Sequence, residues 1–422
     1  MTGVTSRVPP AGPTAPRASV DLFVARQPIF DRARNVVAYE LLFRSGLQNA
    51  FGNADPNQAS VSMLDTSLLG FGLESLVGDK QAYFNATRDV KVKQHWALLP
   101  SSQSVIEILE TVEPDDEVYA ACLAAKQAGY KLALDDFVFR PAYEPLLGLT
   151  DVVKVDFLAT KGEERRSLVS RFGPRGIRML AEKVETYEEF QFGLDAGYEL
   201  FQGYFFCKPE VITGKDVPSV KTNLLRLIQE INRPDLDFDR LEQVIKSEVA
   251  LSVRLLRYLR SAGFGWRHEI ESIGQALRVL GENNTRKWAS LVALTMIGDD
   301  KPTELITTSL VRAQLCEQLG IEGKLPGRHS DLFLAGLLST LDALLDRPMD
   351  AILTQLSVTE EIRSALTGGG TPLGDTLQLA VSYDRADWDR VAELAPRFKM
   401  PAPVLPAAYR HAVEWVSKLS AA

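Results

Sequence analysis

The stretch LALDDFVFR, residues 132–140, is an apolar run that ends in two adjacent aspartates, Asp135 and Asp136. Its apolar part predicts a buried strand, and two like charges at the end of that strand repel each other unless a cation lies between them. Two interpretations follow. Either the aspartates face water and cap a turn, or they hold a metal ion, and the neighbouring segments decide between the two.

Short β-rich runs and helical stretches alternate between about residues 21 and 208. Helical stretches, such as residues 114–129 and 186–197, separate most of the runs, and the second has the capping-box pair Thr186 and Glu189 and ends on Gly197. Eight strands that alternate with helices predict an α/β fold, a (β/α)8 TIM-like barrel. The β-rich runs are residues 22–30, 36–43, 82–87, 104–110, 130–137, 152–158, 177–184 and 198–206.

The first two runs are joined only by DRARN, residues 31–35. So short a link can join antiparallel neighbours but not parallel ones, so the first strand of the barrel is expected to be antiparallel. From about residue 219 the pattern is helical throughout, with apolar residues at three- and four-residue spacing, which predicts an all-α domain. We therefore expect a disordered leader over 1–19, the barrel over 20–212 and the all-α domain over 213–422.

Composition limits the classes of function. The chain has 422 residues and a net charge of −8, which argues against binding a nucleic-acid polymer, because that requires a basic surface. No apolar run reaches the roughly 20 residues that span a membrane, and the N-terminus has no apolar segment typical of a secretory signal. The three widely spaced cysteines are those of a reduced, cytoplasmic protein.

Polar residues lie at or near the end of every predicted strand. In a barrel these ends converge on one face, so we expect the side chains to meet there. One lysine among so many carboxylates leaves excess negative charge, which Mg²⁺ or Mn²⁺ would neutralise. Two such ions close together are the usual arrangement for cleaving a phosphodiester. The residues are Gln27, Glu40, Arg44, Asn85, Glu107, Glu110, Asp135, Asp136, Lys154, Asp156, Glu182, Glu185 and Gln202.

Each of these residues alone has a purely structural explanation. The aspartate pair could cap a turn, Glu40 and Arg44 could form an exposed pair, and Lys154 could extend to the rim of the barrel. Their occurrence at successive strand ends favours the metal site, and with it the interpretation that Asp135 and Asp136 share metal.

The same motifs resemble those of EAL-type cyclic di-GMP phosphodiesterase domains over residues 22–210. The segment ELLFR, residues 40–44, stands in the place of the Glu-Ala-Leu signature, and YFNAT, EILE, LALDDF, VVKVD, LAEKVET and FQGYFFCKP follow in the family's order. The resemblance implies hydrolysis of cyclic di-GMP to linear pGpG at a two-metal site with Mg²⁺ or Mn²⁺, and it allows for a homodimer. It implies metal binding by Glu40, Asn85, Glu107, Asp135 and Asp136, water activation by Lys154, Asp136 and Glu182, ligand binding by Gln27, Arg44 and Gln202, and support of a loop by Glu110.

Three positions depart from the family's pattern. Leu109 replaces a threonine, Lys183 replaces a glycine, and the loop after Phe137 contains Val138 and Pro141 instead of glycine and serine. Val138 cannot adopt positive φ cheaply, and Pro141 stiffens the turn. Two hypotheses therefore stay open: an active phosphodiesterase, or a catalytically silent regulator that acts through protein–protein interaction.

The second half resembles the HDOD domain. The likeness lies in residues 247–265, 270–281 and 333–345. Metal-using relatives of that domain place His and Asp where this chain has Ser339 and Thr340. Neither residue is a suitable ligand for a two-metal hydrolase. We therefore expect the second half to be a helical scaffold without catalytic activity that docks an unknown signalling protein.

Overall fold

The computed structural model describes part of the chain, and the leader expected over residues 1–19 lies outside that part. The described residues are 22–45, 72–88, 94–208, 219–233, 235–247, 251–252, 254–255, 272–323, 329–354, 356, 358–398, 400–401 and 403–420.

Eight strands form a closed barrel in the order in which they occur along the chain. The first strand pairs antiparallel with both of its neighbours, and the other pairings are parallel, which confirms the expected hairpin at the start of the barrel. The strands are β1 (Leu22–Asp31), β2 (Val36–Ser45), β3 (Gln81–Ala86), β4 (Ser104–Ile108), β5 (Lys131–Leu134), β6 (Val152–Asp156), β7 (Arg178–Glu182) and β8 (Leu200–Gln202).

In the described part of the barrel, α-helices follow β2, β4, β5, β6 and β7. The cap predicted for the last of them is present: the Thr186 hydroxyl accepts a hydrogen bond from the Glu189 amide at 3.2 Å, and Gly197 ends the helix at φ +98°. The helices around the barrel are α2 (Leu73–Val77), α4 (Asp116–Gln127), α5 (Glu144–Leu147), α6 (Glu163–Phe172) and α7 (Tyr187–Ala196), with 3₁₀ turns at His95–Leu98, Pro141–Tyr143, Gly173–Arg175 and Phe205–Cys207.

The described part of the second half is helical. Gly281, the last residue of one of the segments that resemble the HDOD domain, interrupts α11 with φ +74° and ψ +169°. The helices are α8 (Ser219–Ile231), α9 (Phe238–Lys246), α11 (Ile273–Ile297), α12 (Thr303–Glu322), α13 (His329–Leu338), α14 (Leu341–Leu345), α15 (Met349–Leu353), α16 (Glu360–Leu366), α17 (Pro372–Asp384), α18 (Trp388–Leu394) and α19 (Val404–Ser420), with a 3₁₀ turn at Ala395–Phe398.

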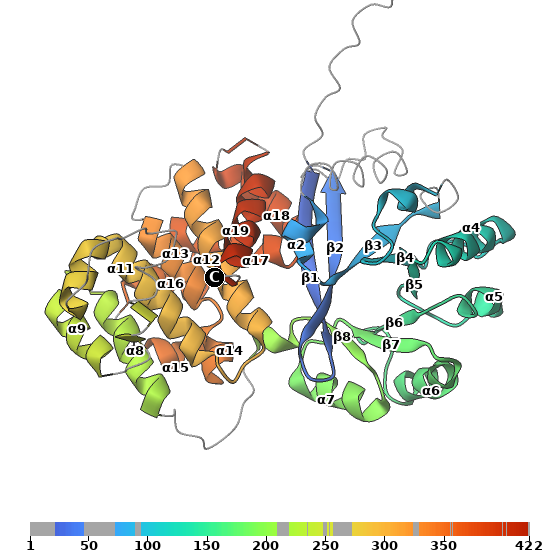
Figure 1. Ribbon diagram of the computed structural model, residues 1–422, viewed down its shortest axis with the longest axis horizontal. Coiled ribbons are helices and arrows are strands. Elements are labelled where there is room, and N and C mark those ends of the chain that lie inside the picture. The colour runs from blue at the N-terminus through green and yellow to red at the C-terminus, as the bar shows by residue number, and fades with distance from the viewer. Residues whose placement is uncertain are drawn as a thin grey trace, which may run out of the picture.

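The helical half packs against the β1–β2 side of the barrel through α17, α18 and α19 (Figure 1). Phe23 of β1 lies against Tyr383 and Trp388, with ring centroids 6.2 and 6.3 Å apart. The buried apolar residues of the two halves form one continuous cluster. The two halves are therefore held together by a shared core as well as by polar contacts.

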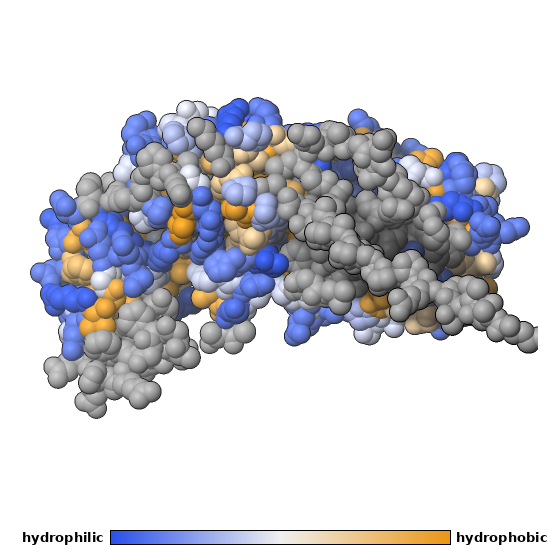
Figure 2. Space-filling model, turned by 90° about the horizontal axis from the view of Figure 1, so that it is seen from above, coloured by the Kyte–Doolittle hydropathy of each residue, from blue (hydrophilic) through white to orange (hydrophobic). Residues whose placement is uncertain are grey.

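The described surface seen from above is mostly hydrophilic, with small hydrophobic patches between the hydrophilic areas (Figure 2). Among the described residues, no helix is both long enough and apolar enough to cross a bilayer.

Candidate active site

The interior of the barrel begins with an apolar layer. Side chains alternate between the two faces of a strand, so each strand sends every second residue inward. Each of the eight strands contributes one residue to a small cluster that is separate from the main core. This layer closes the barrel below the candidate site, and it consists of Ile29, Ala38, Tyr83, Val105, Ala133, Val152, Leu180 and Leu200.

A polar layer lies directly above the apolar one. On each parallel strand, the inward-facing residue two positions after the apolar layer is polar. This layer lies at the C-terminal ends of the strands, where the active sites of such barrels are found. On antiparallel β1 the equivalent position is two residues earlier. The sequence-predicted site residues in this layer are Gln27, Glu40, Asn85, Glu107, Asp135, Lys154, Glu182 and Gln202.

Four carboxylates of this layer surround one ammonium group, and we call them the carboxylate ring. Lys154 Nζ lies 3.2 Å from Glu40 Oε2, 2.6 Å from Glu107 Oε1, 2.9 Å from Asp135 Oδ1 and 2.8 Å from Glu182 Oε1. Lys154 is 1% exposed and Glu107 is fully buried. A buried ammonium is tolerated only when it is paired, and here it balances part of the negative charge that converges on the site.

Amide side chains fix the orientation of Glu40. Gln202 Nε2 donates to Glu40 Oε2 at 2.7 Å, and Asn85 Nδ2 donates to Glu40 Oε1 at 3.0 Å. Gln202 also donates to Gln27 Oε1 at 3.0 Å. Gly203 allows the chain to turn directly after Gln202, because a Cβ there would lie 2.1 Å from the carbonyl oxygen of Val184.

The pKa values within the ring diverge. Burial raises the pKa of Glu107 well above its usual range, and repulsion by Glu40 adds to this effect. Burial also raises the pKa of Glu182 to about 8, although Lys154 opposes the shift. Burial would raise the pKa of Glu40 too, but Lys154 and the hydrogen bond from Gln202 outweigh it and lower the pKa. The pKa values of Glu107 and Glu182 are therefore shifted upward and that of Glu40 downward, so these three carboxyls differ in how readily they hold a proton.

The paired aspartates point to different partners. Asp135 joins the ring, whereas Asp136 has φ +40°, and its Oδ1 lies 3.5 Å from Lys183 Nζ. Lys183 itself has φ +54° and also contacts Asp156 Oδ2 at 2.5 Å. The position where the resemblance expects glycine thus keeps a left-handed backbone but carries an ammonium next to the second aspartate.

Two predicted site residues lie away from the ring. Arg44 is two inward positions beyond Glu40 on β2, and its Nη1 is 3.8 Å from Asp389 Oδ1 of α18. Glu110 has an exposed side chain, and its backbone carbonyl accepts a hydrogen bond from the Tyr143 hydroxyl at 3.4 Å. Tyr143 belongs to the loop after β5, so Glu110 touches that loop through its main chain. Val138 in the same loop is 68% exposed and avoids positive φ.

The oxygen donors of the site fit a divalent cation. No group of three or more His, Cys, Asp or Glu side chains within the described ranges is arranged to hold a metal ion, and the carboxylates converge on Lys154 instead. Four buried oxygens of the polar layer, however, have neither a hydrogen-bond partner nor an ion pair among the described residues, an arrangement that is costly without a further ligand. They are Asn85 Oδ1, Glu107 Oε2, Glu182 Oε2 and Gln202 Oε1. All are hard ligands of the kind that Mg²⁺ and Mn²⁺ prefer.

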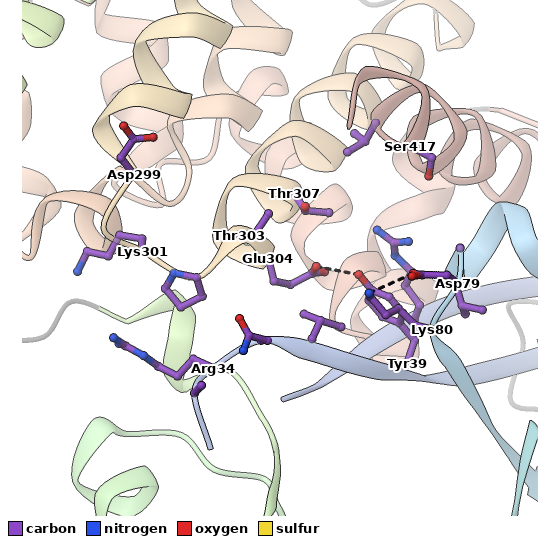
Figure 3. A pocket seen from close by; sticks show the side chains of 18 of the residues that line it. Arg34, Tyr39, Asp79, Lys80, Asp299, Lys301, Thr303, Glu304, Thr307 and Ser417 are labelled. Atoms are coloured by element: carbon purple, nitrogen blue, oxygen red, sulfur yellow. Dashed lines mark hydrogen bonds and ion pairs between the residues drawn. The ribbon is translucent and has the colours of Figure 1, made fainter. Parts of the chain in front are cut away.

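A cavity of about 590 Å³ lies between the two halves, outside the barrel (Figure 3). It is lined by the β1–β2 turn, Asp79, Lys80 and the start of α12. Tyr39, which points outward where its neighbour Glu40 points inward, donates to Glu304 Oε2 at 2.8 Å. Burial raises the pKa of Glu304 to about 7, against the effect of Arg26. This cavity is separate from the carboxylate ring.

At the position singled out in the sequence of the second half, Thr340 is 1% exposed, and its hydroxyl shares a hydrogen bond with Ser309 of α12. Thr340 therefore serves as a buried polar contact between helices.

Two contacts from the helical half to the mouth of the barrel have no signal in the sequence. The backbone carbonyl of Arg385 accepts a hydrogen bond from Gln27 Nε2 at 3.2 Å, and Asp389 faces Arg44. These partners are separated by more than 340 residues, and no pattern in the sequence indicates that they meet.

Comparison with known protein families identifies a domain in each half of the chain. The model of the EAL domain matches residues 91–209, and that of the HDOD domain matches residues 217–355. The EAL match begins after β3, so the assignment of Gln27, Glu40 and Asn85 to the site rests on the geometry described above.

Two relatives match most of the chain. Cyclic di-GMP phosphodiesterase CdgJ of Vibrio cholerae is 35% identical over 374 residues, which cover 88% of this chain and 87% of the relative. The uncharacterized protein YuxH of Bacillus subtilis is 34% identical over 406 residues, covering 94% and 98%. Among solved structures, BlrP1 of Klebsiella pneumoniae with calcium and cyclic di-GMP is 26% identical with a TM-score of 0.38, covering 46% of this chain and 57% of that one. The chain belongs to the family of proteins in which an EAL domain is followed by an HDOD domain.

Proposed function

We propose that the barrel binds cyclic di-GMP and hydrolyses it to linear pGpG with the help of two Mg²⁺ or Mn²⁺ ions, and that the HDOD domain regulates the barrel or docks a signalling protein. The observation that carries the proposal is the polar layer, in which every strand contributes one oxygen- or nitrogen-bearing side chain above a closed apolar floor. The name of the Vibrio cholerae relative supports the same substrate.

The proposed roles are those that the resemblance to EAL domains implies for these residues. Glu40, Asn85, Glu107, Asp135 and Asp136 would bind the cations, which supply Lewis acidity at the phosphodiester. Lys154 would orient the attacking water through its ammonium. Glu182, whose pKa burial raises to about 8 in the metal-free protein, would accept the proton of that water in its deprotonated form, with Asp136 as the second catalytic carboxylate. Gln27, Arg44 and Gln202 would hold the ligand.

Turnover of cyclic di-GMP by purified protein with Mg²⁺ or Mn²⁺, followed by chromatography, tests the proposal. Glu107→Gln should abolish product, since mutating groups that only support metal ligands already costs about 10–100-fold. Because burial raises the pKa of Glu107 and thus favours its neutral form in the metal-free protein, the neutral glutamine of the same shape should preserve the fold. Glu188→Gln, at an exposed glutamate of α7, is the matched control. Equal rates for the wild type and Glu107→Gln would disprove the assignment of the site.

The second candidate function is a cyclic di-GMP receptor without turnover. The contact of Lys183 with Asp136 favours it, because an ammonium at that carboxylate competes with a second cation. Tight binding of cyclic di-GMP without product would establish the receptor. Absence of both binding and product would leave a role in protein–protein interaction alone.

A further inference from the structure

The turn between α17 and α18 lies at the ligand-binding end of the barrel. We call residues 383–389 the α17–α18 corner. Gln27 Nε2 donates to the backbone carbonyl of Arg385 at 3.2 Å, and Arg44 Nη1 lies 3.8 Å from Asp389 Oδ1. Both candidate ligand-binding residues on the β1–β2 hairpin thus contact the helical half, and Figure 1 shows α17 and α18 beside that hairpin.

The corner is held in place from two sides. Tyr383 is fully buried and packs edge-on against Trp388, with ring centroids 5.3 Å apart. Arg312 of α12 lies 2.9 Å from the carboxylate of Asp384, and the Asp384 carbonyl accepts a hydrogen bond from the Tyr204 hydroxyl at 3.1 Å. The position of Asp389 is therefore fixed by the fold, although its own side chain is 82% exposed.

A chain of hydrogen bonds connects the corner to the carboxylate ring. The carbonyl of Arg385 accepts from Gln27, Gln27 accepts from Gln202 at 3.0 Å, and Gln202 donates to Glu40 at 2.7 Å. Both ends of the Gln27 amide are occupied in this arrangement. A ligand that uses Gln27 and Arg44 must therefore exchange contacts with the corner for contacts with its own phosphate.

We propose that the α17–α18 corner and the cyclic di-GMP phosphate compete for the barrel mouth, with Asp389 as the internal anion that occupies Arg44. The inference rests on the proposed function and names the residue through which the helical half tunes it. By linkage, a ligand that weakens docking of the corner is itself bound more weakly when the corner is docked. Asp389 also weakens ligand binding, because it places a negative charge next to an anionic ligand.

Binding of cyclic di-GMP to the full chain, measured by fluorescence anisotropy with Mg²⁺ and with intact ligand verified by chromatography, tests the proposal. Asp389→Asn should lower Kd about two- to fivefold, the range expected for removing one exposed ion pair. The effect should shrink at high salt, because ions screen this pair. Asp350→Asn is the matched control, since Asp350 is also an exposed aspartate in the first turn of a helix and lies in α15.

Hydrogen exchange gives a second readout, and amides of residues 384–394 should exchange faster when the ligand is added to the wild-type protein. An unchanged or higher Kd for Asp389→Asn would overturn the inference while leaving the proposed function intact. A similar decrease in Kd for Asp350→Asn would also overturn it, because the effect would then reflect net charge alone. If none of the three proteins bound cyclic di-GMP, the proposed function would fail, and this inference with it.

Discussion

Replacing Lys154 with methionine removes the charge at the centre of the carboxylate ring and keeps the length of the side chain. The ammonium lies 2.6–3.2 Å from four carboxylates. At an effective dielectric constant of about 20, one such contact at 2.8 Å is worth on the order of 6 kcal/mol before desolvation is counted. Breaking a buried charge pair typically costs about 3–5 kcal/mol, and we expect Lys154→Met to destabilise the metal-free protein by that amount.

Thermal unfolding in EDTA measures this loss. For a domain of this size, about 3–5 kcal/mol corresponds to a decrease in Tm of roughly 6–20 °C. The loss should be largest above about pH 8 and smaller near pH 5, because protonation of the ring carboxyls relieves their repulsion at low pH. Mn²⁺ should raise the Tm of the variant more than that of the wild type, since the ion would replace the missing positive charge.

Lys126→Met is the control. Lys126 forms a partly exposed pair with Asp151 at 2.7 Å, and losing such a pair costs about 1 kcal/mol or less. If Lys154→Met loses no more stability than Lys126→Met at pH 8, or gains no more from Mn²⁺ than the wild type, the ammonium does not hold the ring together.

Three further substitutions test other parts of the structure. Lys183→Gly removes the ammonium 3.5 Å from Asp136, and glycine readily adopts the φ of +54° at this position. Calorimetry should therefore show tighter Mn²⁺ binding, with the free energy of unfolding changed by less than about 1 kcal/mol. Unchanged Mn²⁺ affinity would show that Lys183 does not compete with a cation at Asp136. In the folded protein the pKa of Glu304 is raised from 4.5 to about 7, so its favourable contribution is complete below about pH 4.5 and is lost as the pH rises to 7. Glu304→Gln should remove about 3 kcal/mol of that pH dependence in denaturant unfolding, and equal slopes for variant and wild type would contradict this. Arg312→Met leaves the largely buried carboxylate of Asp384 without its guanidinium and should cost about 3–5 kcal/mol in the same assay. A loss below about 1 kcal/mol would show that the pair does not anchor the corner.

Much of the barrel and its polar layer could be predicted from local patterns. The alternation of inward and outward residues places Glu107 two residues after Val105 and Lys154 two residues after Val152, so their common face follows from the sequence alone. The five-residue link 31–35 likewise required the antiparallel first strand that the structure has. The alternation of side chains along a strand repeats every two residues and depends only on neighbouring residues, so it can be predicted without knowledge of the fold.

The alternation of side chains along the strands does not predict the orientations of Asp136 and Glu110, which depend on the three-dimensional structure. Asp136 is adjacent to Asp135 in the sequence, yet the left-handed backbone at Asp136 turns its carboxylate toward Lys183. The sequence showed a lysine where glycine was expected, but not that the lysine reaches the second aspartate. Similarly, Glu110 lies at a strand end but out of phase with Glu107, which leaves its side chain exposed.

The amino-acid sequence by itself determined the two halves, the barrel and the identity of the acids at its mouth, because strand period and helix period are set by neighbouring residues. Only the tertiary structure decided that Lys154 stands at the centre of the acids and that the corner near Asp389 reaches Arg44 and Gln27. Those contacts join segments distant in sequence, and their geometry depends on barrel closure and on the packing of the shared core between the halves.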